Sequence, residues 1–372
     1  MIYLDNAATT RPFDSVIQRM ETFYKEAYFN PSALYAPAMR VEDELEKARD
    51  YINNVLGGGG KVFFTSCATE SNTWVYHSAR KNKKGNVVVS MGEHASGYGN
   101  AQALLGQGVD VRFVRLTKSG AVDMADFMQK IDADTCLVSI IHCSNETGAV
   151  NDLRALSDAV KRVAPQALFH SDGVQALGKL PVHCCALGVD LYSVSAHKIG
   201  GAKGVGALWV RDGIRLQPLI VGGGQEQNAR SGTENVAGIV GFAEALRVFL
   251  QTDGKQIAML RQNMQSALAG LENVTVHNAQ ENSPYILSFS VLGLKAEILQ
   301  RKLAEQNILI GLGSACASRW KKNRVLVAMG YGMPHIESNV RISFGANNLQ
   351  DDMVYVQKTL IDTINALRTN IR

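Results

Sequence analysis

Ser195-Ala196-His197-Lys198 is the stretch of sequence that decides the fold. Apolar runs at residues 189–194 and 207–210 flank it, and glycines are spaced through residues 199–206. This pattern predicts two strands joined by a loop that allows close backbone approach. A lysine in such a loop suits a Schiff base, because a buried amine loses its charge more readily and becomes a nucleophile. An isolated loop lysine is more often a surface residue, so the interpretation needs support from elsewhere in the chain.

Asp172 gives the first support. It follows the strand-like residues 167–171, and Gln175 comes one turn later. Enzymes that use pyridoxal phosphate need a lysine for the covalent bond and a carboxylate that keeps the pyridine nitrogen protonated. An aspartate at a strand end is more often a turn or a helix cap. Together with Lys198, however, Asp172 indicates a pyridoxal phosphate site.

Residues 63–72, Phe-Phe-Thr-Ser-Cys-Ala-Thr-Glu-Ser-Asn, give the second support. An apolar strand is followed by a turn of small residues and by the expected start of a helix. Free backbone N–H groups at a helix start bind phosphate. An ordinary strand-to-helix connection is the alternative interpretation.

With these residues in view, the chain resembles the cysteine desulfurase family, the NifS-like and IscS-like enzymes of the class V aminotransferase group. Ten blocks match in order and cover essentially the whole chain. They are Tyr3-Leu4-Asp5-Asn6-Ala7-Ala8-Thr9-Thr10, Asn30-Pro31-Ser32, Ala68-Thr69-Glu70-Ser71, Glu93-His94, Asn145-Glu146-Thr147-Gly148, Asp172-Gly173-Val174-Gln175, Ser195-Ala196-His197-Lys198, Arg230-Ser231-Gly232-Thr233, Gly313-Ser314-Ala315-Cys316 and Val340-Arg341-Ile342-Ser343.

Length and periodicity predict two domains. A chain of 372 residues exceeds a comfortable single core. Strands and helices alternate from about residue 60 to 210, which predicts an α/β fold with a largely parallel sheet. The resemblance implies the fold type I architecture, with a seven-stranded sheet in the large domain. We expect a pyridoxal phosphate domain at 13–252, and a smaller α+β domain formed by 1–12 and 253–372.

Composition narrows the class of protein. The net charge of +4 is mild and gives no reason to expect direct binding to nucleic acid. No apolar run approaches a membrane span, and the N-terminus does not read as a signal peptide, so we expect a cytoplasmic protein. The six cysteines show no disulfide framework. His183-Cys184-Cys185 has no matching ligand pair elsewhere, so no metal is expected.

The resemblance implies roles for the remaining site residues. His94 lies over the cofactor ring and exchanges protons. Asn145 and Gln175 bind the ring hydroxyl, and Asn145 also lies at the substrate. The phosphate is bound by the backbone of Ala68 and Thr69, by Ser195 and His197, and by Thr233 from the other subunit of a homodimer with shared active sites.

Arg341 is the expected substrate-binding residue. It lies in the strand-like residues 340–344. A buried arginine is costly unless it meets an anion, and its planar fork fits the carboxylate of L-cysteine. An arginine on the solvent face of a strand is the alternative.

Cys316 is the expected nucleophile. It follows Gly313-Ser314-Ala315 in a segment rich in glycine and small residues. The resemblance implies that its thiolate takes the sulfur of cysteine as a persulfide, releases alanine and passes the sulfur to an acceptor, a cluster scaffold or a thiolation enzyme. We expect a mobile loop over residues 311–322. The basic residues Arg319, Lys321, Lys322 and Arg324 follow, either as a solvated face or as a charge that favours the thiolate.

Four positions depart from the family pattern: Cys67, Phe29, Gln227 and the pair Gly311-Leu312. They surround the expected phosphate turn, substrate entry and sulfur loop, and they put the acceptor in doubt rather than the cofactor. A selenocysteine lyase or another class V enzyme such as an aminotransferase stays open as the alternative. Cys316 discriminates, because a transaminase has no use for it. A cofactor-less structural role would require the loss of Lys198, Asp172 or His94, and all three are present.

Overall fold

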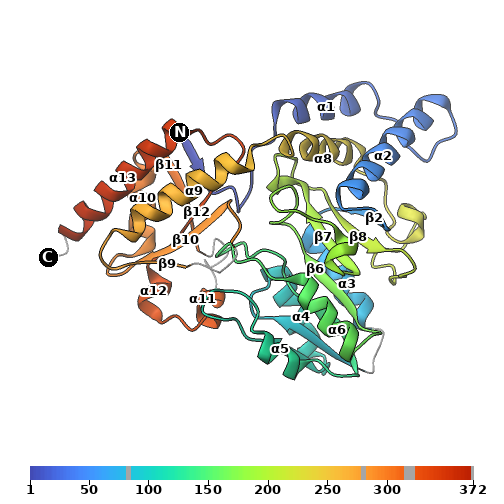
Figure 1. Cartoon of the computed structure of the whole chain (residues 1–372). Coiled ribbons are helices and arrows are strands. Elements are labelled where there is room, and N and C mark those ends of the chain that lie inside the picture. The colour runs from blue at the N-terminus through green and yellow to red at the C-terminus, as the bar shows by residue number, and fades with distance from the viewer. Residues whose placement is uncertain (81–84, 278–281, 314–322, 370–372) are drawn as a thin grey trace.

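The computed structural model describes residues 1–80, 85–277, 282–313 and 323–369. Within these residues the strands form two separate sheets, one of seven strands and one of five. Figure 1 shows the two sheets side by side, with helices packed around each. The N-terminal strand is part of the smaller sheet, and the C-terminal helix lies beside that sheet.

The larger sheet carries the Lys198 loop. Its strand order is β2-β8-β7-β6-β5-β3-β4. The pairs from β7 through β6, β5 and β3 to β4 are parallel, and β8 runs antiparallel to both its neighbours. The strands are β2 (Gly60–Thr65), β3 (Asn86–Ser90), β4 (Val111–Val114), β5 (Thr135–Ser139), β6 (Leu168–Asp172), β7 (Leu191–Ser195) and β8 (Gly206–Arg211).

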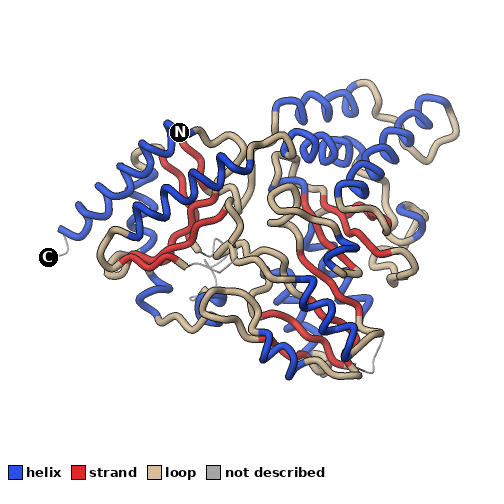
Figure 2. Tube along the Cα trace, viewed as in Figure 1, coloured by secondary structure: helices blue, strands red, loops and turns tan. Residues whose placement is uncertain are grey.

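Buried central strands explain the continuous apolar runs in the sequence. Every residue of β3 and of β7 is buried, as expected when helices cover both faces of a parallel sheet. The helices of this part of the chain pack around the sheet, as Figure 2 shows. They are α1 (Asp14–Lys25), α2 (Ala36–Val55), α3 (Ala68–Arg80), α4 (Ala95–Gly106), α5 (Met124–Lys130), α6 (Leu153–Val163), α7 (Cys184–Leu187) and α8 (Val236–Phe249). The seven-stranded, mostly parallel sheet confirms the expected fold class.

The smaller sheet has the order β1-β11-β12-β10-β9. Its strands are β1 (Ile2–Leu4), β9 (Val274–Val276), β10 (Ile286–Val291), β11 (Ile308–Leu312) and β12 (Asn339–Ser343). The helices of this part are α9 (Gly254–Ala269), α10 (Ala296–Ala304), α11 (Arg324–Ala328), α12 (Met333–Glu337) and α13 (Gln350–Thr369). The chain start pairs with β11 in parallel, so residues from both ends of the chain share this sheet. The division of the chain at residues 12 and 252 stays a prediction.

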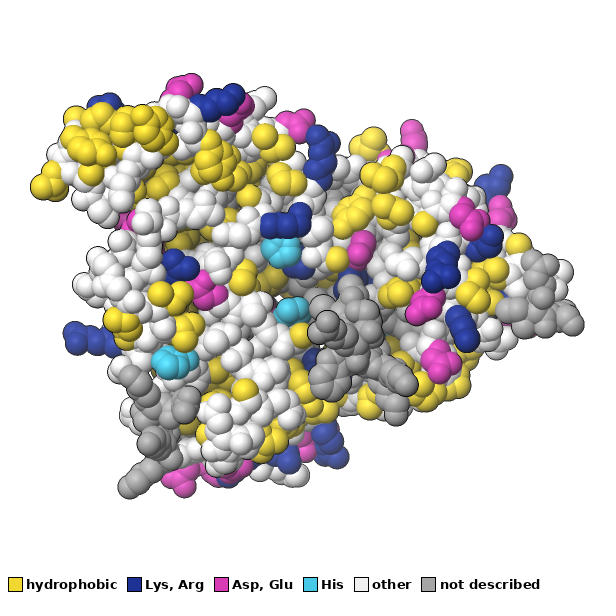
Figure 3. All heavy atoms as spheres, turned by 180° about the vertical axis from the view of Figure 1, so that it is seen from behind, with side chains coloured by type: hydrophobic (Ala, Val, Ile, Leu, Met, Phe, Trp, Pro, Cys, Tyr) yellow, Lys and Arg dark blue, Asp and Glu magenta, His cyan; other side chains and the backbone are white. Residues whose placement is uncertain are grey.

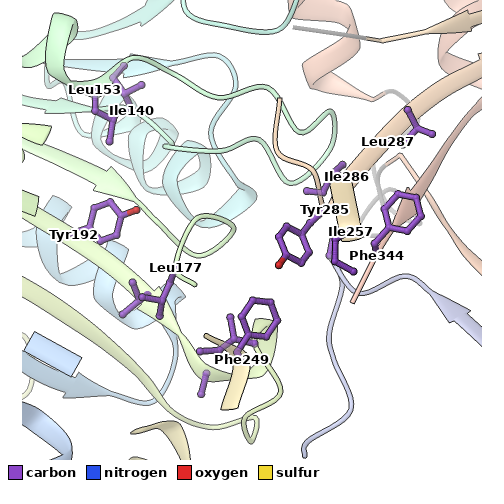
Figure 4. Close-up of a cluster of buried hydrophobic side chains, with 14 of the residues drawn as sticks. Ile140, Leu153, Leu177, Tyr192, Phe249, Ile257, Tyr285, Ile286, Leu287 and Phe344 are labelled. Carbon is purple, nitrogen blue, oxygen red and sulfur yellow. The ribbon is translucent and has the colours of Figure 1, made fainter. Parts of the chain in front are cut away.

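An apolar core fills the space between the two sheets. The rings of Phe249, at the end of α8, and Tyr285, before β10, lie 5.8 Å apart. Figure 4 shows Leu177 on one side of this contact and Ile257 on the other. These residues belong to one continuous buried cluster, which holds the two sheets in a set orientation.

Two further findings concern membrane-spanning helices and metal-binding groups. None of the described helices is long and apolar enough to cross a membrane. The described residues also hold no group of three histidine, cysteine or acidic side chains placed to bind a metal ion.

Candidate functional site

Lys198 lies at the end of a short helical turn, η1 (Ala196–Lys198), directly after β7. Its Nζ donates to the carbonyl oxygens of Ala7 at 2.7 Å and Ala8 at 2.6 Å. The chain then turns sharply at Gly200, whose φ is +81°. A Cβ there would lie 2.1 Å from the ring of Phe13, so only glycine fits. The glycine-spaced loop therefore packs closely against the N-terminal segment and positions Lys198 beside Ala7 and Ala8.

Gln175 reaches the same segment. Its Nε2 donates to the Ala7 carbonyl oxygen at 2.9 Å, and its Oε1 accepts from Lys179 Nζ at 2.9 Å. Lys179 is buried, and burial, followed by the charge of Lys198, lowers its pKa to about 7. The Ala7 carbonyl thus joins Gln175 and Lys198, two residues that the sequence predicted for one site.

Asp172 ends β6 and is only 3% exposed. Its Oδ1 accepts from the Val174 N–H at 3.1 Å, and its Oδ2 accepts from Asn72 Nδ2 at 2.9 Å. Both oxygens of the carboxylate therefore have a donor. A carboxylate in this buried position suits a pyridine nitrogen as its partner.

His94 is the N-cap of α4. Its Nδ1 lies 2.8 Å from Ser96 Oγ and accepts from the Ser96 N–H at 3.2 Å. Burial lowers the pKa of His94, an effect that Asp172 opposes and Lys198 reinforces. The ring is therefore neutral near pH 7, and Asp172 and Lys198 are close enough for their charges to act on it.

The expected phosphate turn lies where β2 passes into α3, which begins at Ala68. The first residue of β8, Gly206, packs directly beneath it, since an added Cβ would lie 2.7 Å from the Cys67 carbonyl carbon and 2.9 Å from the Ala68 nitrogen. Ser195 pairs with Gly206 across β7 and β8. Ala68, Thr69 and Ser195 are thus brought together at one helix N-terminus, the arrangement that a phosphate needs.

His197 and Thr233 have different surroundings. His197 Nδ1 lies 3.1 Å from Thr9 Oγ1, and burial lowers its pKa to about 4. Thr233 lines a hollow of about 130 Å³ together with Ser66, Gly204 and Arg230. Ser66 belongs to the β2–α3 turn, so Thr233 shares this hollow with the expected phosphate turn of its own chain.

Arg341 lies in β12 and is 2% exposed. One terminal nitrogen donates to Asp5 Oδ1 at 2.7 Å, and the other donates to the Asn145 carbonyl oxygen at 2.7 Å. Its Nε is buried, and no acceptor among the described residues meets it. The sequence expected an arginine free for a substrate carboxylate, whereas the structure shows one already paired with Asp5.

Gly311 makes room for this ion pair. A Cβ at that position would lie 2.4 Å from Asp5 Oδ1 and 3.0 Å from the guanidinium of Arg341. One of the four departures from the family pattern therefore has a structural reason. Cys316 and the basic residues at 319, 321 and 322 lie outside the described residues. The predicted mobility of residues 311–322 falls largely on the same segment.

Sequence reasoning missed the residues that hold the predicted ones in place. Asp5, Asn72, Ser96 and Lys179 each contact a predicted site residue. Asp5 lies in the matching block at residues 3–10, and Asn72 lies in the expected phosphate segment at residues 63–72. Their place in these segments was a signal that they contribute to the site. Ser96 and Lys179 lie two and four residues from His94 and Gln175, so the helix-cap and one-turn spacings were the signals that could have found them.

We compared the chain with known proteins. The family model described as aminotransferase class-V matches residues 2–356. A curated cysteine desulfurase IscS 1 of Archaeoglobus fulgidus is 33% identical over 380 residues, covering 99% of this chain and 98% of the relative. A cysteine desulfurase IscS of Dictyoglomus turgidum is also 33% identical, covering 99% and 95%.

Solved structures agree with these relatives. A NifS-like protein superposes with a TM-score of 0.90 at 33% identity, covering 99% of both chains. A NifS-like protein from Rickettsia africae gives a TM-score of 0.87 at 29% identity, covering 98% of this chain and 99% of that one. The match spans both sheets and every described site residue. The chain therefore belongs to the class-V aminotransferase family of pyridoxal phosphate enzymes.

Proposed function

We propose that this protein is a pyridoxal phosphate-dependent cysteine desulfurase, which converts L-cysteine to L-alanine and transfers the sulfur to an acceptor. The observation that carries the proposal is the convergence of Lys198, Asp172 and His94, in a chain similar over its full length to curated cysteine desulfurases. The buried Arg341 on the facing sheet adds a binding group for an amino-acid carboxylate.

The residues fit the cofactor. The close packing of Gly206 against the Cys67–Ala68 backbone shapes a cradle at the start of α3, where we place the phosphate with Ala68, Thr69, Ser195 and His197 as its contacts. Asp172 would hold the pyridine nitrogen, and Gln175 with Asn145 would bind the ring hydroxyl. Pyridoxal phosphate held there by Lys198 would supply an electron sink for bonds at the substrate α-carbon.

Side chains of the protein bind the substrate and transfer protons. Arg341 binds the cysteine carboxylate with the donors left beside its pair with Asp5, so that Asn145 and Arg341 orient the substrate between the two sheets. The N-terminal segment at Ala7 and Ala8 closes one side of the site around Lys198. Lys198 and His94 are the side chains that would exchange protons with the substrate.

The sulfur step falls to Cys316. Its thiolate attacks the substrate sulfur, an S–S bond forms, and the C–S bond breaks. The electron pair of the C–S bond stays with the substrate carbon, which takes up a proton to give alanine. The sulfur remains as a persulfide on Cys316, ready for an acceptor such as a cluster scaffold or a thiolation enzyme.

We also propose a homodimer. Residues at the corner of α1 and α2 expose large apolar side chains, with Tyr28 at 69% and Leu34 at 94% exposure. Tyr24, Tyr35 and Met39 of the same segment are exposed as well. Figure 3 shows apolar side chains gathered over this corner of the molecule. An apolar patch of this kind marks an interface. In that dimer, we propose that Thr233 of one chain serves the site of the other. The cytoplasmic location stays a prediction.

The test is to mix the purified, cofactor-loaded protein with L-cysteine and to measure alanine and persulfide. Equal release of both is expected, with the added sulfur found by mass spectrometry on Cys316. The variant Cys316→Ser should keep the yellow colour and release no sulfur. If that variant retained full activity, or the sulfur were on Cys67, the weight would move to the alternative, a lyase of the selenocysteine type.

A further inference from the structure

A chain of hydrogen bonds joins Asp172 to His94 through two residues that have no part in the proposed chemistry. Asn72 lies in α3 and is fully buried, and Ser96 is the second residue of α4. Asn72 Nδ2 donates to Asp172 Oδ2 at 2.9 Å and to Ser96 Oγ at 2.8 Å. Both hydrogens of the amide are thus in use.

The orientation of the Asn72 amide follows from the carboxylate beside it. An ionised carboxylate only accepts hydrogen bonds, so the nitrogen and not the oxygen of Asn72 must face Asp172. The Asn72 Oδ1 is left buried, and no donor among the described residues meets it. An orphaned acceptor of this kind shows that the two donated bonds dictate the arrangement.

The position of the proton on His94 follows in the same way. A backbone N–H can only donate, and the Ser96 N–H points at His94 Nδ1. Ser96 Oγ accepts from Asn72, so its own hydrogen is free to donate to the same ring nitrogen at 2.8 Å. Nδ1 is therefore an acceptor twice over. A neutral ring in this setting carries its proton on Nε2.

We propose that Asn72 and Ser96 are positioning residues that hold His94 as the Nε2–H tautomer and tie its orientation to Asp172. Resting on the proposed function, this makes His94 a proton donor toward the bound substrate in its ground state. A step that needs a base is then left to another group, of which Lys198 is the nearest candidate. Through these hydrogen bonds the buried amide of Asn72 orients Asp172 directly and orients His94 through Ser96.

The first test reads the tautomer directly and needs no substitution in the relay. Nitrogen NMR of histidine-labelled holoenzyme at neutral pH should show one ring nitrogen of His94 without a proton and one with it. The His94 signals are assigned by their loss in His94→Gln. Long-range couplings to the ring protons should identify the unprotonated nitrogen as Nδ1. A proton on Nδ1 would overturn the proposal. This outcome is independent of desulfurase activity, so it separates a failure here from a failure of the proposed function.

The second test uses variants. Ser96→Ala and Asn72→Leu should each lower kcat about tenfold, the worth of one hydrogen bond to a charged or polarised group, with KM for cysteine changed less than twofold. Ser96→Thr keeps the hydroxyl and should restore kcat. The double variant should be no worse than the poorer single variant, because both residues act as one unit. Additive losses would contradict the relay.

Asn100→Ala is the matched control. Asn100 also links α3 to α4, donating to Thr73 Oγ1 at 3.0 Å and to the Ser96 carbonyl oxygen at 2.7 Å, but it contacts neither Asp172 nor His94. Its loss should leave kcat and the visible absorption maximum unchanged, whereas Asn72→Leu should shift that maximum, because Asp172 loses a partner. Equal effects of the two variants would reduce Asn72 to a structural role and overturn the proposal. Should Asn72→Leu fail to fold, Asn72→Ala replaces it with a smaller side chain that cannot donate, and the same loss is expected.

Discussion

At the scale of the residue, Arg341 shows how a predicted binding group is prepared by its neighbours. Asp5 and the Asn145 carbonyl hold its two terminal nitrogens in place, so the fork is oriented before substrate enters. Arg341→Lys should raise KM for cysteine at least about tenfold, because lysine keeps the charge but cannot span both partners and a carboxylate. Steady-state kinetics measure this.

Arg154→Lys serves as the control for Arg341. Arg154 forms an exposed pair with Asp158 at 3.0 Å, far from β12 in the sequence. It should leave KM and kcat unchanged. An unchanged KM in Arg341→Lys as well would mean that the substrate carboxylate is bound elsewhere.

The buried charge of Lys179 lowers the free energy of unfolding by an amount that depends on pH. Its pKa of about 7 in the folded chain lies below the usual value, because the side chain is buried and lies near the charges of Lys198 and Arg341, whereas Cys143 acts to raise the pKa. Below about pH 7 Lys179 is charged in both states, and the full cost of burying the charge is present. Between about pH 7 and 10 only the unfolded chain binds the proton, so the cost disappears as pH rises.

The free energy of unfolding of the wild type should therefore rise relative to that of Lys179→Met as pH increases from about 7 to 10. Urea denaturation of both proteins at several pH values measures the difference. A difference that stays constant across this range would show that Lys179 is not a depressed titrating group. Lys61→Met, at an exposed position, is the control and should show no such trend.

At the scale of the element, the start of β8 and the start of α3 form one unit. The φ angle of Gly206 is one that any residue can adopt, so glycine is required there only because the Cys67–Ala68 backbone leaves no room for a Cβ. Gly206→Ala should push the Cys67–Ala68 backbone outward and weaken cofactor binding about tenfold or more, because the phosphate contacts depend on that backbone. Titration of the apoenzyme with pyridoxal phosphate, followed by its absorption, measures the affinity.

Gly99→Ala is the matched control for the element. Gly99 lies in α4, and an added Cβ there meets nothing within 4 Å. Cofactor affinity should be unchanged, and stability should increase slightly, because alanine favours a helix more than glycine does. Equal affinities in Gly206→Ala and Gly99→Ala would show that the phosphate does not lie at the β2–α3 turn.

At the scale of the whole molecule, the proposed dimer makes a prediction about which chain completes which site. Thr233→Ala and Lys198→Ala should each be inactive or nearly so. If Thr233 serves the partner's site, a hybrid dimer contains one site with both residues intact. Co-expression of the two variants should then restore about a quarter of the wild-type activity, since half of the random dimers are hybrids with one working site.

No restoration in the hybrids would show that Thr233 serves its own chain, for which the hollow shared with Ser66 and Gly204 provides room. Sedimentation of Leu34→Asp tests the interface separately. That substitution should shift the protein toward the monomer if the apolar corner of α1 and α2 is covered by a second copy.

Much of this molecule follows from its sequence because the relevant signals are local. Asn151-Asp152 and the apolar spacing after them are typical of a capped helix over 153–163, and the structure has α6 at Leu153–Val163 with Asp152 as its cap. The buried strands before Asp172 and Lys198 came from apolar runs, and strand–helix alternation predicted the mostly parallel sheet. These features depend on residues within one or two turns of each other, where periodicity and capping act.

Only the tertiary structure showed which residues are the hydrogen-bond and ion-pair partners of the site residues. Ala7 meets Lys198 across 191 positions in the sequence, and Asp5 meets Arg341 across 336, in a space that Gly311 leaves open. Asn72, in α3, bridges β6 and α4. No periodic pattern encodes such pairs, because they arise only when two sheets and their helices pack at one relative position. The sequence by itself determined the elements and the chemistry carried at their ends, whereas packing determined the partners, and with them the charge, tautomer and orientation of each group.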